Sequence, residues 1–166
     1  MSVFVAVLAA VAMQRGGELV LAAANTRRLL ARGAREVDSG GYKWFVLLHA
    51  GWLAALVLTV SPPAAPSWPW LVVYAILQLG RLWVIATLGR RWTTRLIVLP
   101  DAPPVQSGPY RLFRHPNYAI VAGEIAVLPL AFGALGVALS FSLGNLLLTV
   151  RRITIEDQAL AQNRTF

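Results

Sequence analysis

The chain has 166 residues, of which 57% are hydrophobic and only 13% are charged. Soluble domains carry roughly 25% charged residues, so this composition excludes an ordinary soluble protein and indicates one embedded in lipid. The absence of cysteine excludes disulfides, zinc–thiolate sites and thiol nucleophiles. The formal net charge of +8 does not indicate nucleic-acid binding, because the basic residues flank apolar segments and form no continuous stripe.

The first half of the chain predicts three helices. The first covers residues 3–30, with its membrane part ending near Asn25; no basic residue precedes the apolar residues 2–13, so we expect a membrane helix and not a cleaved leader. A polar link at residues 31–41 leads to a second helix at 42–60, which Pro62 ends. Prolines keep the next residues irregular, and a third helix follows at 70–88.

The second half begins with the longest polar stretch, residues 90–112. Pro116 then opens a fourth helix, because the first turn tolerates a residue without an N–H. The apolar run 118–150 exceeds the ~20 residues of one span, and Pro129, Gly133 and Gly136 interrupt it, so we expect a tight hairpin of a fourth and a fifth helix. Residues 151–162 should form a short amphipathic tail helix.

The expected fold is therefore an all-α, polytopic integral membrane protein with about five transmembrane helices and a short cytoplasmic C-terminal helix. We expect residues 1–166 to form a single membrane-embedded domain. Thirteen of the fifteen lysines and arginines fall in the link after the first helix, in the link after the third, or in the tail. By the positive-inside rule these parts are cytoplasmic and the N-terminus lies outside.

A few polar residues lie inside the apolar segments. At ~1.5 Å per helical residue, Glu18 and Glu124 both lie ~10 Å below the cytoplasmic boundary, and His49, Arg81 and Arg15 lie ~9 to 15 Å below it. Charges facing lipid at that depth cost about 3 kcal/mol each, so they should face inward and pair. The set is Arg15, Glu18, His49, Gln78, Arg81 and Glu124.

Two interpretations of this layer are open. In the first it is structural, with Glu18 paired to Arg81 and Arg15 paired to Glu124. In the second it also lines a polar pocket that opens to the cytoplasm. A lone His49 is more often a hydrogen-bonding group between helices than a catalyst.

The densest polar motif is Ser-Gly-Pro-Tyr-Arg-Leu-Phe-Arg-His-Pro-Asn-Tyr at residues 107–118. Pro109 and Pro116 each fix a backbone angle, and the N–H groups that follow Pro116 begin a helix unpaired. Such a helix start attracts an anion, and Arg111 and Arg114 reinforce that attraction. The tyrosines of the motif offer aromatic faces to a ring or a cation. The alternative interpretation is a basic membrane-interface anchor with an aromatic belt.

Three elements together resemble the isoprenylcysteine carboxyl methyltransferase family: Gly-x-Tyr at residues 108–110, Arg-His-Pro-x-Tyr at 114–118, and Arg-x-x-x-Glu at 152–156, with a hydrophobic hairpin before the last. The resemblance covers about residues 90–160. It implies a small multipass methyltransferase that binds S-adenosylmethionine from the cytosol and accepts a lipophilic substrate from the bilayer. Residues 90–166 would be the cofactor-binding half.

The first half of the chain resembles one bacterial branch of this family. The residues that carry this likeness are Glu18, Asn25 and the segments 33–36, 48–49, 81–85 and 91–95. The branch includes methyltransferases that accompany type III polyketide synthases and methylate alkylpyrones or alkylresorcinols. The resemblance implies a bacterial inner-membrane protein whose partners are a lipophilic small molecule and membrane lipid.

The resemblance also implies individual roles. Arg152 would face the acceptor, and Glu156 would hold a polar part of the cofactor. Two departures matter: Asp157 stands where the family often has a second glutamate, and the chain lacks the longer tail that commonly closes the pocket. We therefore expect a cover that is incomplete or supplied by a partner. The implied cofactor contacts are Pro103, Pro104, Val105, Tyr110, His115, Pro116, Asn117, Tyr118 and Glu156.

The chemistry depends on the acceptor. A carboxylate or acidic enol arrives as an anion, needs no strong base, and suits a bidentate contact from Arg152. A phenol must lose a proton, and His49, Glu18 and Glu124 are the catalytic candidates for accepting it. Polyketide-type acceptors lead, ahead of prenylated carboxylates and phospholipid amines. No metal site is expected. The rival interpretations are a small transporter or channel and a non-catalytic scaffold subunit.

Overall fold

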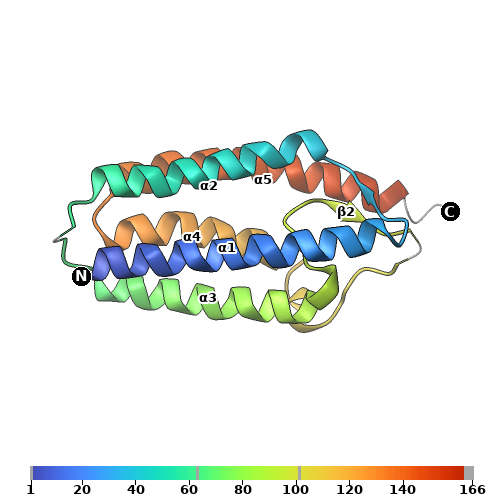
Figure 1. The fold of residues 1–166 in the computed structure, drawn as a ribbon, viewed down its shortest axis with the longest axis horizontal. Coiled ribbons are helices and arrows are strands. Elements are labelled where there is room, and N and C mark those ends of the chain that lie inside the picture. Colours follow the sequence, from blue (N-terminus) through green and yellow to red (C-terminus); the bar gives the residue numbers. More distant parts are fainter. Residues whose placement is uncertain (1, 63, 101, 163–166) are drawn as a thin grey trace.

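The computed structural model describes residues 2–62, 64–100 and 102–162, so Arg164 of the basic tail lies outside it. Five helices run along the long axis of the molecule (Figure 1): α1 (Val3–Leu30), α2 (Ser39–Thr59), α3 (Trp68–Leu88), α4 (Pro116–Ala131) and α5 (Leu135–Gln162). The start of α1 and the end of α5 lie at opposite ends of the bundle. The expected hairpin of a fourth and a fifth helix is present.

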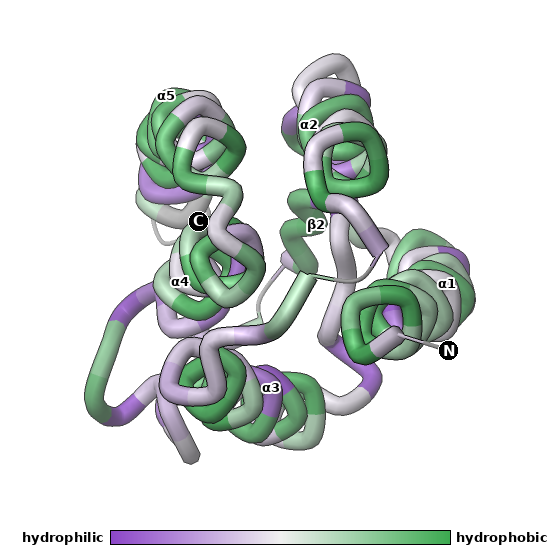
Figure 2. Tube along the Cα trace, turned by 90° about the vertical axis from the view of Figure 1, so that its left-hand side faces the viewer, coloured by the Kyte–Doolittle hydropathy of each residue, from purple (hydrophilic) through white to green (hydrophobic). Residues whose placement is uncertain are grey.

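Seen end-on, the helices form a ring (Figure 2). Along this ring α3 packs on α4, α4 on α5, and α5 on α2, while α1 lies between α2 and α3. The helices α1 and α2 and the segment Trp68–Arg91 are long and apolar enough to cross a membrane, and α4 is a shorter apolar helix. The protein is therefore a helical membrane protein with three candidate spans. The count of five spans stays a prediction.

Several helix boundaries differ from the sequence predictions. The helix α2 starts earlier than residue 42, because Asp38 caps it by accepting the N–H of Gly41 at 3.1 Å. The expectation that Pro69 lies in an irregular segment was wrong, because this proline occupies the first turn of α3, where a missing N–H costs nothing. Pro116 does open α4 as predicted. Residues 151–162 continue α5, since no proline or glycine interrupts residues 145–162.

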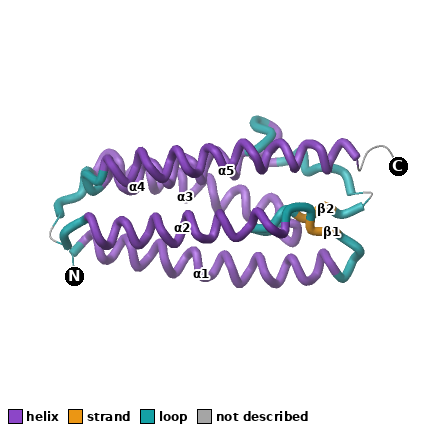
Figure 3. The backbone as a smooth tube through the Cα atoms, turned by 90° about the horizontal axis from the view of Figure 1, so that it is seen from above, coloured by secondary structure: helices purple, strands orange, loops and turns teal. Residues whose placement is uncertain are grey.

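A small sheet corrects the all-α expectation. The strands β1 (Arg35–Glu36) and β2 (Ile97–Val98) pair antiparallel, with Arg35 opposite Val98. Strands of two residues are too short to leave an alternating pattern in the sequence. The sheet lies at the end of the bundle where α2 begins (Figure 3). It joins the link between α1 and α2 to the segment after α3, which also contains the short 3-10 helices η1 (Gly89–Arg91) and η2 (Gly108–Arg111).

The interior is divided along its length. The half next to the α2–α3 and α4–α5 turns is apolar and includes the fully buried Trp52, Leu56 and Leu128. The indole N–H of Trp52 donates to the carbonyl of Ile125 at 3.2 Å, which satisfies a polar atom that would otherwise be stranded there. This half is a hydrophobic core, and the buried charged side chains lie toward the other end.

Between the halves lies what we call the charged layer, formed by Arg15, Glu18, Arg81 and Glu124. Arg81 donates to both oxygens of Glu18, at 2.6 and 2.7 Å, and to Glu124 at 2.9 Å. Arg15 donates to Glu18 at 2.9 Å and to Glu124 at 2.6 Å. Gln78 adds a bond to Glu124 at 2.8 Å. Both predicted pairs are confirmed and are cross-linked, so the layer ties α1, α3 and α4 together with balanced charge.

We expect Arg81→Met to destabilise the fold by roughly 3 to 5 kcal/mol, because it leaves two buried carboxylates with a single cation. Thermal unfolding in detergent, followed by circular dichroism, measures the loss. Arg28→Met, at an exposed position of the last turn of α1, is the matched control and should unfold like the wild type. Equal melting temperatures for the two variants would contradict a structural role for the layer.

Candidate functional site

A cavity of about 1000 Å³ lies above the charged layer. It occupies the end of the bundle where the α1–α2 link, the segment after α3 and the last turns of α5 come together (Figure 1). The start of α4 lies at this same end. Residues far apart in the sequence, from Arg15 to Asp157, therefore line one cavity. Arg15, Glu18 and Arg81 of the charged layer form part of its wall.

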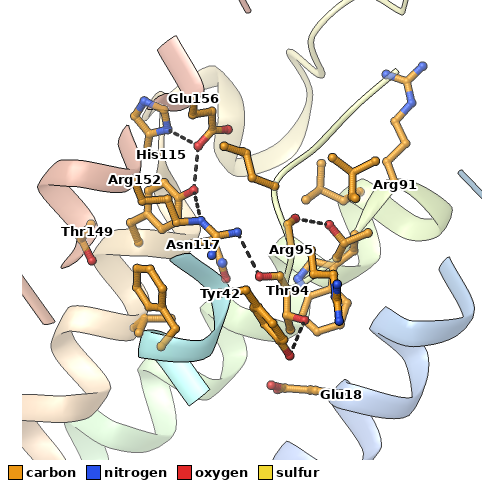
Figure 4. Close-up of a pocket in the computed structure, with 18 of the residues that line it drawn as sticks. Glu18, Tyr42, Arg91, Thr94, Arg95, His115, Asn117, Thr149, Arg152 and Glu156 are labelled. Carbon is orange, nitrogen blue, oxygen red and sulfur yellow. Dashed lines mark hydrogen bonds and ion pairs between the residues drawn. The ribbon is translucent and has the colours of Figure 1, made fainter. Parts of the chain in front are cut away.

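On the α5 side, Arg152 is held by neutral groups (Figure 4). Its Nε donates to the hydroxyl of Tyr118 at 3.1 Å, and its Nη2 donates to the carbonyl of Thr94 at 2.9 Å. Its guanidinium also lies over the rings of Phe45, at 5.1 Å, and Tyr118, at 5.8 Å. Within the described part of the chain no carboxylate bonds to it directly. A buried cation with only neutral partners attracts an anion.

Glu156 lies one turn further along α5, which places it on the same face as Arg152. Its Oε2 accepts the hydroxyl of Tyr118 at 2.6 Å, so Tyr118 bridges the cation and the carboxylate. The ring of His115 stacks on that of Tyr118 with centroids 5.5 Å apart, and its Nδ1 lies 3.8 Å from the same Oε2 of Glu156. His115, Tyr118, Arg152 and Glu156 thus form one connected wall of the cavity. Figure 4 labels three of them, His115, Arg152 and Glu156.

Two polar atoms in this wall lack a hydrogen bond, although one of them, the Nε2 of His115, lies 3.7 Å from the Oδ1 of Asp157. The Nε2 of His115 and the Oδ1 of Asn117 are buried, and neither has a hydrogen bond to any residue the structure describes. Both residues line the cavity. Buried polar atoms in folded proteins almost always find a partner. Here the missing partners point to a small polar ligand.

The start of α4 differs from the expected row of free N–H groups. No side chain caps the helix, but the N–H groups of Tyr118 and Ala119 turn back to the carbonyl of His115 at 3.2 and 3.4 Å. Among the described residues only the N–H of Asn117 is left open in this turn. The anion-binding potential of the helix start is smaller than predicted, and the nearby arginines carry more of it.

Tyr110 reaches the cavity from η2 because of an unusual turn. Gly108 has a φ of +56°, and a Cβ there would collide with Thr87 and Trp83, so only glycine fits. Burial, assisted by the negative charge of Glu156, raises the pKa of Tyr110 to about 12. Its hydroxyl therefore stays protonated at physiological pH and is available as a hydrogen-bond donor.

Residues 91–99 and 102–106 line the cavity and will be called the cover. Asn25, only 1% exposed, donates to the carbonyls of Gly89 at 3.1 Å and Trp92 at 2.8 Å. The hydroxyl of Thr94 donates to that of Tyr42 at 3.2 Å. These bonds attach the cover to α1 and α2. In the sequence, the polar Asn25 on the inward face of an apolar helix was the feature that indicated such a contact.

The deep wall contains His49. Its Nδ1 lies 2.8 Å from the carbonyl of Phe45. A carbonyl only accepts, so the neutral ring carries its hydrogen on Nδ1 and keeps a lone pair on Nε2. His49 and Glu18 both line the cavity, whereas Glu124 is 0% exposed and does not. Glu124 therefore supports the charged layer and has no direct access to a substrate proton.

The cavity gathers most of the residues that the sequence suggested. Pro103, Pro104, Val105, Tyr110, His115, Asn117, Tyr118, Arg152 and Glu156 all line it. Pro116 does not, because it is buried in the first turn of α4. Sequence reasoning missed Tyr42 and Phe45, which carry no motif, and gave no role to Thr94; these residues contact Arg152 or each other across the cavity. The individual roles stay predictions.

Comparison with known proteins identifies the family of the chain. Residues 70–162, more than half of the chain, match the sequence profile of a family of membrane methyltransferases. The chain belongs to the isoprenylcysteine carboxyl methyltransferase family. It is also 33% identical over 159 residues to the "uncharacterized protein YpbQ" of Bacillus subtilis (strain 168), which covers 93% of this chain and 95% of that protein. No solved structure matches the chain.

We expect Asn25→Ala to loosen the cover, because it removes two buried hydrogen bonds worth about 1 kcal/mol each. Hydrogen–deuterium exchange in residues 92–99 should accelerate about tenfold. Thr26→Ala, at a neighbouring buried position, is the control and should leave exchange in this segment unchanged. Identical exchange in both variants would show that the cover does not depend on Asn25.

Proposed function

We propose that the protein is an S-adenosylmethionine-dependent O-methyltransferase that methylates an oxygen of a lipophilic acceptor taken from the membrane. The observation that carries this proposal is the shared cavity. It holds a buried arginine with neutral partners, Arg152, beside two unpartnered polar atoms on His115 and Asn117. Arg152 suits an anionic acceptor, and the polar atoms of His115 and Asn117 suit a polar cofactor.

The residues present fit the cofactor that this family generally uses. The free Oδ1 of Asn117 accepts hydrogen bonds, which suits an ammonium or an exocyclic amine. The carboxylate of Glu156 suits a hydroxyl or amino group, and Arg114, which also lines the cavity, suits a carboxylate. Bound here, S-adenosylmethionine would supply a methyl group on a positively charged sulfur. The family membership and these unpartnered groups support the assignment together.

Methyl transfer needs alignment and exclusion of water more than it needs a strong base. Arg152 favours an acceptor whose reacting oxygen is already ionised, such as a carboxylate or the acidic enol of an alkylpyrone. A phenolic acceptor, such as an alkylresorcinol, would pass its proton to the lone pair of His49. Because the arginine is the better defined of the two sites, we favour an alkylpyrone-type acceptor over a phenol, with prenylated carboxylates as the next class.

The cavity reaches the lipid-facing surface between α1 and α2, which lie side by side (Figures 2 and 3). Leu19 of α1 and Val46 of α2 both line the cavity, yet they are 48% and 43% exposed. Ala50, one turn beyond Val46, likewise lines the cavity and is exposed. We infer that the alkyl tail of the acceptor leaves through this opening while its polar head meets Arg152.

The arginine-rich end supports the proposed orientation. Arg91, Arg95, Arg111 and Arg114 all lie around the mouth of the cavity. By the positive-inside rule this end faces the cytoplasm, where the cofactor is available, and the N-terminus faces outward. We propose the inner membrane of a bacterium as the location, with each of the five helices embedded in it.

Calorimetry with S-adenosylhomocysteine on the purified protein tests the cofactor site. We expect binding by the wild type and about tenfold weaker binding by Asn117→Ala, because the variant loses one hydrogen-bond acceptor for the ligand. Asn145→Ala is the matched control: Asn145 is also buried with an unpartnered Oδ1, but it does not line the cavity. Absence of binding by the wild type would overturn the proposal, and transfer of labelled methyl to an alkylpyrone in vesicles would extend it.

We expect Ala50→Trp to fill the opening between α1 and α2. The KM for a long-chain acceptor should rise about tenfold while that for a short, methyl-substituted analogue stays unchanged, because only the long tail needs the exit. Leu47→Trp, exposed on the same helix but away from the cavity, is the control. Equal effects on long and short acceptors would contradict this path.

A further inference from the structure

The segment between η2 and α4 presents two exposed apolar side chains that the proposed function does not use, with an arginine on each side of them. Four consecutive exposed residues, Arg111, Leu112, Phe113 and Arg114, join the turn to the helix start. Leu112 is 70% exposed and Phe113 is 63% exposed. We call these four residues the docking loop. The connection to α4 stands out from the side of the bundle next to α3 and α4, with hydrophobic positions between hydrophilic ones (Figure 2).

The depth of the loop follows from the length of α4. This helix has 16 residues, so it is about 24 Å long, whereas the hydrocarbon core of a bilayer is about 30 Å thick. A helix that is shorter than the core cannot carry its preceding loop far beyond the headgroups. With α4 embedded as proposed above, the docking loop lies at the membrane boundary. There its two apolar side chains contact the acyl chains, and the arginines beside them lie among the headgroups.

The loop is mechanically tied to the cavity. The N–H groups of Leu112 and Phe113 both donate to the carbonyl of Pro109 at 3.1 Å, which makes residues 109–113 one compact turn. Tyr110 precedes the loop and His115 follows it, and both line the cavity. A displacement of the loop thus displaces the cavity wall on both sides.

We propose that the docking loop binds the anionic headgroup region of the bilayer and so holds the cofactor wall in place. Leu112 and Phe113 enter the acyl-chain boundary, and Arg111 contacts lipid phosphates, whereas Arg114 is paired with Asp157 at 3.2 Å on the cavity side. Charge complementarity selects acidic phospholipids as the occupant. The interaction goes beyond methyl transfer, because it makes the cofactor site respond to the composition of the membrane.

The first test measures depth and is independent of the proposed function. The chain has no cysteine, so a single Phe113→Cys substitution can carry a nitroxide label without background. In vesicles we expect this label to be accessible to oxygen and shielded from a water-soluble nickel chelate. Ala31→Cys, exposed in the link after α1, is the control and should show the opposite preference. Equal nickel access at both positions would overturn docking.

The second test measures coupling to the cavity. The affinity for S-adenosylhomocysteine should be about fivefold higher in phosphatidylglycerol-containing nanodiscs than in phosphatidylcholine nanodiscs. The double variant Leu112→Ser, Phe113→Ser should lose this difference, since neither residue lines the cavity. Equal wild-type affinity in both lipids would overturn the coupling. An equal gain from inorganic phosphate in neutral nanodiscs would overturn the lipid as occupant.

Failure of the proposed function gives a different result. If S-adenosylhomocysteine binds in neither lipid, the cofactor assignment falls while the nitroxide measurement still decides whether the loop docks. If it binds equally in both, the cofactor assignment stands and the coupling falls.

Discussion

The structure depends on the bonds that Arg81 makes to two carboxylates at once. Its planar guanidinium meets Glu18 through two donors and Glu124 through a third. Such a fork binds carboxylates in a fixed geometry, which a lysine does not reproduce. Because Glu18 is on α1 and Glu124 on α4, the side chain of α3 sets the spacing of three helices. For this reason charged side chains form the floor of the cavity, while the interior of the opposite half of the bundle is apolar.

The sequence predicted the charged layer well because its cause is strong and general. Ionised groups cannot face lipid cheaply, so four of them at one depth on three helices have to meet. The start of α4 at Pro116 was equally well determined by proline chemistry. The family motifs likewise placed His115, Tyr118, Arg152 and Glu156 in one site, and the structure brings them together.

The cover and the small sheet were not predictable in the same way. Their stability comes from contacts between residues distant in the chain, such as Asn25 with Trp92 and Arg152 with Thr94. Two-residue strands have no periodicity, and Phe45 resembles any other membrane residue until Arg152 lies over its ring. The unbroken α5 shows the converse: the change from apolar to polar composition at residue 151 does not mark the end of a helix.

The first and last helices contribute to opposite walls of one chamber, which has a consequence for biogenesis. Glu18 and Asn25 are made early, whereas Arg152 and Glu156 lie in the final turns of α5. During synthesis, α1 and α3, which carry Arg15, Glu18 and Arg81, are made before α4, which carries Glu124. Until that helix arrives, two arginines share a single glutamate. The complete lining of the cavity can therefore form only after synthesis is almost finished.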